Sequence, residues 1–384
     1  MIASILIIAV FFSLLPALFP FVIILLSYFF KHQYPLISNP SKETEELPFV
    51  SILIPVHNKA LQLKEKLTDI SNSDYPGSRI EIIVLLDGEV KGAKKAAADY
   101  RAAEPDGPEL NIIQLPRAGK NRALSSGAQK AKGSLLLFTD ADARIKQSAI
   151  TRLVETLKNH ETGGACGRHM LTSESTAQKA YWDMEAKIKS SEMKIFGSVT
   201  ASYGTFIAIK KHLFLPIPDG VTDDHYITLS VAARGLKFAY SPEAIVYIEK
   251  PSKNLIMEIT RKRRITSQSF YSLKAWRTLL NPFKSGWYSI CLWCHKVLRR
   301  LFPVFAIITF ISTLLLSFHG NTAAIIFLVL QSFFYLISIF ALIIGIRKQK
   351  LFKPLRLAAF FLAANIGMLL GLIDFMRGKK AVIW

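Results

Sequence analysis

Residues 135–142 read Leu-Leu-Leu-Phe-Thr-Asp-Ala-Asp, a short apolar run that leads directly into two carboxylates. Residues 82–86 are similarly apolar and lead into Asp87. In a wound α/β sheet, ligands bind beyond the carboxyl ends of the strands. An Asp at a strand end is often only a turn former, and this alternative stays open for Asp87. Two carboxylates one residue apart can face one hard cation, so Asp140 and Asp142 are candidate ligands of Mg²⁺ or Mn²⁺.

The middle of the chain alternates short apolar runs with amphipathic stretches, and this alternation predicts a fold. Strands are predicted at residues 49–55, 80–86, 111–115, 134–139, 165–170, 205–209 and 238–248. Helices are predicted at residues 59–70, 90–103, 120–131 and 148–159. Strands that alternate with helices of this length form βαβ units, so we expect an α/β domain with a mostly parallel wound sheet.

Three blocks of the chain contain no charged residue: 1–30, 301–346 and 357–373. A helix needs ~20 apolar residues to cross a hydrocarbon core of ~30 Å. The first block predicts one transmembrane helix, and His319-Gly320-Asn321 divides the second into two. The third has basic residues on both sides, so a span and a re-entrant helix both stay open.

Three cysteines, at positions 166, 291 and 294, form no disulfide framework and indicate a reducing compartment.

The 48 Lys and Arg residues outnumber the 28 Asp and Glu residues, which gives a formal net charge of +20. Much of this excess lies beside the apolar blocks, at Lys31 and in residues 261–264, 347–356 and 377–380. Basic residues there orient membrane helices with their flanks in the cytoplasm. A nucleic-acid-binding groove would need interleaved aromatic and basic residues, which the sequence does not show. We therefore expect a membrane protein whose α/β domain faces the cytoplasm, and no nucleic-acid partner.

Residues 51–58, Ser-Ile-Leu-Ile-Pro-Val-His-Asn, resemble the opening strand and loop of inverting family-2 glycosyltransferases with the GT-A fold, a Rossmann-like wound sheet. Asp87, residues 140–142 and residues 222–224 follow in the order of that family. The resemblance covers about residues 48–268, and the flanking apolar blocks are similar to those of the membrane-integrated branch that includes cellulose, hyaluronan and ceramide glycosyltransferases.

The resemblance implies a role for each matching residue. Asp87 would contact the nucleotide base, usually uracil, and Lys120 would lie near the nucleotide. Asp140 would lie near the ribose and the metal, and Asp142 would bind the Mg²⁺ or Mn²⁺ that bridges the diphosphate. Asp224 would be the catalytic base that takes the proton of the acceptor hydroxyl, a role typically worth ~10²–10⁴-fold in rate.

Two further segments resemble the acceptor side of the family's site. Asp223 stands where the family usually has Glu, and it equally fits the first turn of a helix over residues 225–233. Gly204 and Thr205 belong to a segment that resembles the loop lining the acceptor site, although a Gly beside a strand is also compatible with a simple turn.

The family's Gln-x-x-Arg-Trp motif aligns with residues 261–265, Arg-Lys-Arg-Arg-Ile. Arg264 keeps the arginine that would face the diphosphate, but Gln and Trp are missing. The resemblance therefore implies transfer of one sugar from a nucleotide-sugar, usually a UDP-sugar, to a lipid or lipid-linked acceptor. A processive polysaccharide synthase with a glycan acceptor is the alternative. A non-catalytic membrane scaffold or receptor with a degenerate fold is the alternative of another class.

Residues 291–295, Cys-Leu-Trp-Cys-His, match the pattern for c-type haem attachment. They lie in a stretch rich in aromatic and basic residues that is typical of a helix at the membrane interface, where it contacts lipids, so no haem is expected.

The predicted organisation is a transmembrane helix (1–30), a GT-A domain (40–250), interfacial amphipathic helices (251–300), a transmembrane region (301–376) and a basic tail (377–384). The expected location is the inner (plasma) membrane of a bacterium.

Overall fold

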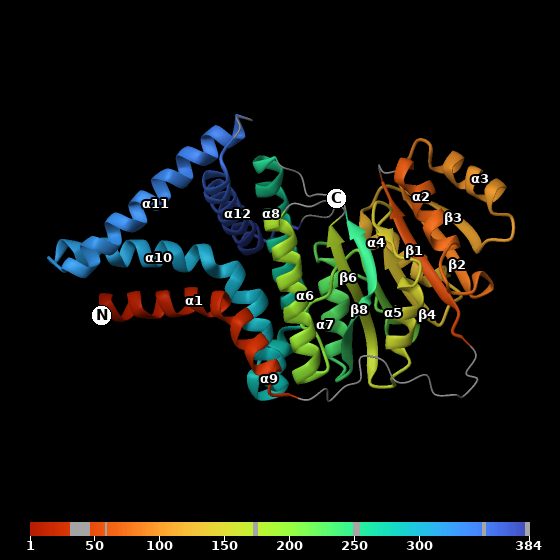
Figure 1. Cartoon of the computed structure of the whole chain (residues 1–384), viewed down its shortest axis with the longest axis horizontal. Coiled ribbons are helices and arrows are strands. Elements are labelled where there is room, and N and C mark those ends of the chain that lie inside the picture. Colours follow the sequence, from red (N-terminus) through yellow and green to blue (C-terminus); the bar gives the residue numbers. More distant parts are fainter. Residues whose placement is uncertain (31–46, 58–59, 172–175, 249–253, 348–350, 381–384) are drawn as a thin grey trace. The chain divides into compact units, whose positions relative to one another are not determined.

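The computed structural model describes residues 1–30, 47–57, 60–171, 176–248, 254–347 and 351–380 (Figure 1). The predictions at Lys31, Asn58 and Lys348 lie outside the described residues. The chain forms two compact units, which we describe separately. The sheet unit comprises Ile23–Lys250 and Ala275–Leu279, and the helical unit comprises Met1–Val22, Pro251–Lys274 and Leu280–Ala381.

One sheet organises the sheet unit, and its described strands follow the order β3-β2-β1-β4-β7-β6-β8-β5. The strands are β1 (Val50–Val56), β2 (Ile80–Asp87), β3 (Glu109–Leu115), β4 (Leu135–Thr139), β5 (Arg144–Ile145), β6 (Thr162–Leu171), β7 (Phe206–Lys210) and β8 (Lys237–Ile248). Strands β1, β2, β3 and β4 run parallel, as expected. Strand β7 runs antiparallel to both of its neighbours, so the sheet is mixed in its second half.

Helices cover both faces of the sheet (Figure 1). They are α2 (Ala60–Ser71), α3 (Ala93–Ala103), α4 (Lys120–Lys130), α5 (Ala149–Leu157), α6 (Thr176–Phe196) and α7 (Asp223–Ala232). All residues of β1, β2 and β4 are buried, which explains their almost uninterrupted apolar sequences. The predicted α/β wound sheet is confirmed. Helix α6 and the two-residue strand β5 were not among the predicted elements.

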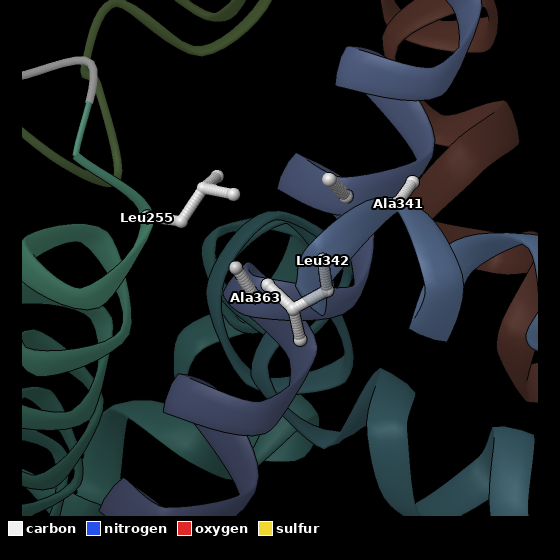
Figure 2. Packing of buried hydrophobic residues seen from close by; sticks show 5 residues of the cluster. Leu255, Ala341, Leu342 and Ala363 are labelled. Carbon is white, nitrogen blue, oxygen red and sulfur yellow. The ribbon is translucent and has the colours of Figure 1, made fainter. Parts of the chain in front are cut away.

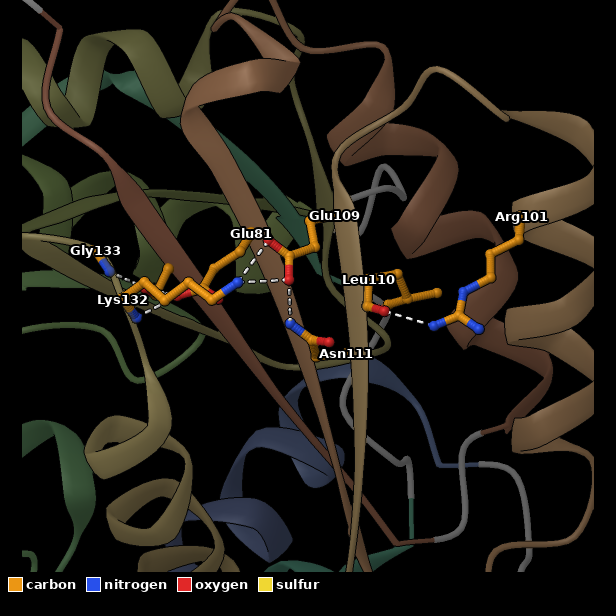
Figure 3. A network of polar contacts seen from close by, with 8 residues as sticks. Glu81, Arg101, Glu109, Leu110, Asn111, Lys132 and Gly133 are labelled. Carbon is orange, nitrogen blue, oxygen red and sulfur yellow. Dashed lines mark hydrogen bonds and ion pairs between the residues drawn. The ribbon is translucent and has the colours of Figure 1, made fainter.

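A polar network ties the amino ends of the strands β1, β2 and β3 together (Figure 3). The buried Glu81 carboxylate accepts hydrogen bonds from the Ser51 hydroxyl and the Lys132 backbone N–H, each at 2.5 Å. The Lys132 ammonium donates to Glu109 at 2.7 Å, and the Asn111 amide donates to the same carboxylate at 3.0 Å. These polar groups connect the amino ends of the strands, whereas the strand-end aspartates lie at the opposite, carboxyl ends.

The helical unit contains α8 (Leu255–Ala275), α9 (Pro282–Leu292), α10 (Leu298–Phe318), α11 (Thr322–Ile346) and α12 (Lys353–Met376), together with most of α1 (Ile2–Ser27). Within the described residues, four segments are long and apolar enough to cross a membrane: Ile2–Ser27, Pro282–Phe318, Thr322–Ile346 and Lys353–Met376. The chain turns at Gly320, with φ at 72°, between α10 and α11 as predicted. Block 357–373 lies within one continuous helix, and whether that helix crosses the bilayer stays a prediction.

Helix α12 packs closely against its neighbours through small residues. Ala359 and Ala363 form a buried cluster with Leu255, Ala341 and Leu342 from α8 and α11 (Figure 2). The small residues continue along α12 at the same spacing, because Gly367 and Gly371 follow at intervals of four. A Cβ at Gly367 would stand 2.6 Å from the carbonyl oxygen of Ile259 on α8. Such small residues let helix backbones approach closely in membrane proteins.

Candidate active site

The carboxyl ends of the parallel strands and the amino end of β7 meet at one edge of the sheet. Thr139, the last residue of β4, is paired with Phe206, the first residue of the antiparallel β7. Asp140 follows Thr139 and Thr205 precedes Phe206, so the strand-end aspartates and the predicted acceptor loop lie beside each other. The direction of β7 therefore assembles segments that are far apart in the sequence.

The Asp87 carboxylate holds the loop in front of α4. It is buried and accepts the backbone N–H groups of Ala118 at 2.7 Å and of Gly119 at 3.1 Å. Gly119 adopts a φ of 94°, which favours glycine. Asp87 thus fixes the backbone that presents Lys120, the first residue of the helix. The predicted contact between Asp87 and a nucleotide base stays a prediction.

Lys120 links two of the predicted site aspartates. Its Nζ lies 2.8 Å from Oδ1 of Asp140 and 2.9 Å from Oδ2 of Asp223, which is in the first turn of α7. Burial would lower the pKa of the Lys120 ammonium, but the two carboxylates outweigh it and raise that pKa above its ordinary value. Asp223 therefore does more than favour the start of α7: it forms an ion pair with the lysine at the sheet edge.

Asp224 lies against the predicted acceptor loop. A Cβ at Gly204 would stand 3.3 Å from Oδ2 of Asp224. The hydroxyls of Ser202 and Thr228 donate to the Asp224 backbone carbonyl at 3.2 and 2.8 Å, and the His225 backbone N–H donates to Oδ1 at 2.7 Å. The loop before β7 and the first turn of α7 are thereby joined, and the carboxylate of Asp224 is half-buried between them.

A buried aromatic cluster supports the same loop. The hydroxyl of Thr205 forms a short hydrogen bond with Nε2 of His169 on β6. The His169 ring stacks on Tyr203 with centroids 4.3 Å apart, and Trp182 of α6 packs against both rings. Burial, helped by the nearby Lys189, lowers the pKa of His169 to about 3. The His169 imidazole is therefore neutral near pH 7. It contacts Thr205 through a hydrogen bond between neutral groups.

A fully buried lysine lies beside the strand-end carboxylates. Lys66 on α2 is 0% exposed, and its Nζ donates to the hydroxyl of Thr139 at 3.0 Å. Burial lowers the pKa of Lys66 to about 8, and the nearby carboxylates of Asp69, Asp140 and Asp142 oppose this decrease. A second cation thus accompanies the Asp140–Asp142 pair, in addition to Lys120.

The residues present suit a divalent cation only together with a second ligand. Among the described residues, no group of three or more His, Cys, Asp or Glu side chains could hold a metal ion by itself. Asp140 and Asp142 are half-buried hard oxygen donors at the sheet edge. Mg²⁺ and Mn²⁺ are commonly held by one or two carboxylates plus phosphate oxygens. The donor set therefore fits a metal ion that is completed by a diphosphate.

Sequence reasoning missed Lys66, His169 and Trp276. A signal existed for Lys66, because it falls at the helical spacing of the buried residues Leu63, Leu67 and Ile70, where an apolar side chain is expected. Trp276 belongs to the sheet unit and packs on Tyr226, two residues after Asp224, with ring centroids 5.6 Å apart. Nothing in the local sequence indicated this contact.

Not every predicted residue belongs to this edge of the sheet unit. Arg264 lies on α8 in the helical unit. Its predicted role at a diphosphate therefore stays a prediction. The basic residues beside it have other partners within the helical unit: Arg261 pairs with Glu258 at 2.8 Å, and Arg263 pairs with Asp374 on α12 at 2.5 Å.

Comparisons with known proteins agree with this geometry. The family model described as "Glycosyl transferase family 2" matches residues 51–215. The "Probable glycosyltransferase YdaM" of Bacillus subtilis (strain 168) is 26% identical over 243 residues, which covers 60% of this chain and 57% of the relative. The "Undecaprenyl-phosphate 4-deoxy-4-formamido-L-arabinose transferase" of Shewanella sediminis is 29% identical over 130 residues, covering 33% of this chain and 39% of the relative. The chain thus spans less than two thirds of the length of these relatives.

A solved structure shares the fold. "Mannosyltransferase PcManGT from Pyrobaculum calidifontis in complex with GDP-Man and Mn2+" aligns over 99% of this chain and 100% of its own, with a TM-score of 0.74 and 18% sequence identity. At this identity the likeness concerns the fold alone. Together with the family match, it confirms the expected GT-A-like α/β fold.

Proposed function

Residues 51–215 are a glycosyl transferase family 2 domain, and from this premise we propose that the chain is an inverting glycosyltransferase. It moves one sugar from a nucleotide-sugar, in our proposal a UDP-sugar, to a lipid or lipid-linked acceptor. The observation that carries the proposal is the gathering of Asp140, Asp223 and Lys120 at one sheet edge, with Asp224 in the adjoining turn of α7.

Asp224 serves in this proposal as the general base. The acceptor oxygen attacks the anomeric carbon of the donor, the bond from that carbon to the diphosphate breaks, and the acceptor proton passes to the Asp224 carboxylate. One base and one in-line displacement invert the anomeric centre. The Asp224 carboxylate is only half-buried and lies against the predicted acceptor loop at Gly204, which supports this role.

In this proposal the charge of the leaving nucleoside diphosphate is stabilised by three residues, Lys120, Asp140 and Asp142. Asp140 and Asp142 would hold Mg²⁺ or Mn²⁺, which neutralises charge on the departing nucleoside diphosphate when it is bound. Lys120 is held at the same edge by Asp140 and Asp223 and keeps its proton, because both carboxylates raise its pKa. It therefore adds a fixed positive charge close to the position at which negative charge develops. Asp87 fixes the loop before Lys120 by accepting hydrogen bonds from the backbone N–H groups of Ala118 and Gly119.

Two features support a lipid or lipid-linked acceptor. Four helices have the length and composition to span a bilayer, so the acceptor can lie in the membrane beside the domain. One of the similar proteins is named as an undecaprenyl-phosphate transferase. The missing Gln and Trp at residues 261–265 support transfer of a single sugar over processive synthesis. In this proposal the sheet unit faces the cytoplasm of a bacterial inner membrane.

The proposal is tested with the purified full chain in lipid nanodiscs. It is incubated with Mn²⁺, a panel of UDP-sugars, GDP-mannose as a comparison donor, and a bacterial lipid extract, and the products are identified by mass spectrometry. We expect one lipid that is heavier by a single sugar. Long polymers would instead support processive synthesis, and binding of a donor without any product would support a non-catalytic scaffold. A sample from which the nucleotide-sugar is omitted is the control for the background of the lipid extract.

The orientation is tested separately by cysteine labelling in intact cells. A single cysteine at Asn321, in the turn between α10 and α11, should react with a membrane-impermeant maleimide from outside. A cysteine at the exposed Lys91 of the sheet unit should react only after the cells are opened. The reverse pattern would place the domain on the opposite membrane face.

A further inference from the structure

Lys66 occupies a position that packing alone does not explain. It lies on the inner face of α2, in register with the buried Leu63, Leu67 and Ile70, and it is 0% exposed. An apolar side chain of similar length would fill the same space without the cost of removing an ammonium group from water. A lysine at such a position therefore requires compensation from its surroundings.

The compensation comes from the end of β4. The Lys66 Nζ donates to the hydroxyl of Thr139 at 3.0 Å, and Thr139 immediately precedes the acidic turn, which we define as residues 140–142. The carboxylates of Asp140 and Asp142 both act on the Lys66 ammonium through their charge. Asp69, one turn further along α2, has the largest effect of the three carboxylates on Lys66, and Arg144, which contacts Asp69 at 2.6 and 2.7 Å, opposes this effect. Through its charge and through Thr139, Lys66 therefore acts on the acidic turn as well as on Asp69.

The acidic turn consequently lies between two cations of different exposure. Lys120 reaches Asp140 with a side chain that is 19% exposed, where a diphosphate can also approach it. Lys66 is sealed inside the domain and cannot be displaced by a ligand. A divalent cation that binds the acidic turn is therefore repelled by the buried ammonium of Lys66, unless negative charge arrives together with the cation.

We propose that Lys66 is the built-in counter-ion of the acidic turn, which makes binding of the divalent cation depend on the nucleoside diphosphate. Without donor, Lys66 offsets the repulsion between Asp140 and Asp142 and weakens their affinity for a free metal ion. With donor, the diphosphate supplies negative charge that outweighs Lys66, and the metal binds with it. Lys66 is thus a positioning residue that acts through Asp140 and Asp142, and this inference rests on the metal-dependent function proposed above.

The test measures metal binding rather than sugar transfer. The affinity of the full chain for Mn²⁺ alone, and for Mn²⁺ with UDP or with GDP, is determined from the electron paramagnetic resonance signal of free Mn²⁺. Lys66→Gln keeps a hydrogen-bond donor for Thr139 but removes the charge. We expect it to bind Mn²⁺ alone about tenfold more tightly than the wild type, which corresponds to ~1.4 kcal/mol, because the repulsion between the ammonium and the divalent cation is removed.

Three companion variants separate charge from structure. Lys66→Arg keeps the charge and should bind Mn²⁺ like the wild type. Thr139→Val removes the hydrogen bond but keeps the charge, and should also leave the affinity for Mn²⁺ alone within about twofold. Lys66→Met is the second neutral variant, used if Lys66→Gln does not fold as judged by circular dichroism. In either neutral variant, the ratio of Mn²⁺ affinities with and without nucleotide should decrease.

The outcomes distinguish this inference from the proposed function. Unchanged or weaker binding of Mn²⁺ alone in a folded neutral variant would overturn the role of Lys66, while metal binding by the wild type with nucleotide would leave the proposed function standing. If the wild type binds no Mn²⁺ with or without nucleotide, the metal-dependent function and this inference both fail.

Discussion

Gly204 lies directly against the carboxylate of Asp224, since a Cβ at position 204 would stand 3.3 Å from both Cγ and Oδ2 of that side chain. These residues belong to the loop before β7 and to the first turn of α7, which the hydroxyls of Ser202 and Thr228 hold together. A side chain at position 204 would therefore press against the proposed base.

Gly204→Ala should lower kcat about 10- to 100-fold without unfolding the domain, because a displacement of the base by a fraction of an ångström is enough to disturb the attacking geometry. Donor affinity should stay close to that of the wild type. Gly77→Ala is the matched control, because its Cβ would meet Pro108 at an ordinary 3.5 Å. Steady-state kinetics on both variants checks the prediction, and a kcat equal to that of the wild type in Gly204→Ala would contradict it.

Asp224→Asn should reduce kcat by ~10²–10⁴-fold for an acceptor that attacks through a hydroxyl, since the amide cannot accept the proton. Binding of UDP with Mn²⁺, measured by calorimetry, should be unchanged. Asp219→Asn serves as the control, because Asp219 pairs with Arg122 at the surface, at 2.5 Å. Full activity of Asp224→Asn would rule out the proposed base.

The same variant also reports on the acceptor. A phosphate oxygen is already ionised near neutral pH and needs no base, so a lipid phosphate acceptor would make Asp224→Asn much less harmful than a lipid hydroxyl would. Comparing the loss of kcat on purified lipid phosphates and on lipids with a free hydroxyl therefore distinguishes the two acceptor classes.

The parts of the site that follow from local sequence were predictable. An apolar run that ends in Asp87 or in Asp140 places the carboxylate at a strand end, because most side chains of a strand that is buried on both faces are apolar. The helical spacing after Lys120 likewise located α4 to within one residue. The wound α/β fold then required only that these units be joined in order.

The parts that depend on tertiary contacts were not predictable. The antiparallel pairing of β7 with β4 is a contact between segments far apart in the sequence, and it brings Gly204 and Thr205 next to the end of β4. The helical spacing of Lys66 indicates a buried position, but nothing in the local sequence identifies its partner Thr139, 73 positions away. The role of His169 was likewise not predictable, because its burial depends on Tyr203 and Trp182 from other elements.

Asp142→Asn should weaken binding of UDP in the presence of Mn²⁺ while leaving binding of UDP without metal almost unchanged, because the amide is a poor ligand for a hard cation. Titrating Mn²⁺ at a fixed concentration of UDP measures the effect. Asp106→Asn, in the surface turn before β3, is a suitable control. An unchanged Mn²⁺ titration curve in Asp142→Asn would exclude this residue as a ligand.

His169 should make the sheet unit sensitive to acid. Its pKa is about 3 in the folded protein and ~6.5 in an unfolded chain, so the unfolded state binds more protons between these values. The free energy of unfolding should therefore fall as the pH drops through this window, by up to about 1.4 kcal/mol per pH unit. His169→Gln should flatten this dependence, whereas His212→Gln, at an exposed position, should retain it. Equal pH profiles of His169→Gln and the wild type would contradict the assignment.

Gly371→Val should destabilise the helical unit. A Cβ at this position would overlap the backbone carbonyl of Arg263 on α8 and stand 2.8 Å from the Thr266 side chain, so α12 would have to move away. Overpacking of this kind typically costs ~1–3 kcal/mol, and the displacement would also weaken the ion pair between Arg263 and Asp374.

The control is Leu357→Val, which places the same residue type at a position of α12 that is 52% exposed. Melting temperatures of both variants in detergent measure the effect, and we expect a clear decrease for Gly371→Val only. If both variants melt at the temperature of the wild type, α8 and α12 do not need the close approach that these glycines permit. A decrease that Arg263→Ala reproduces alone would instead assign the stability to the ion pair.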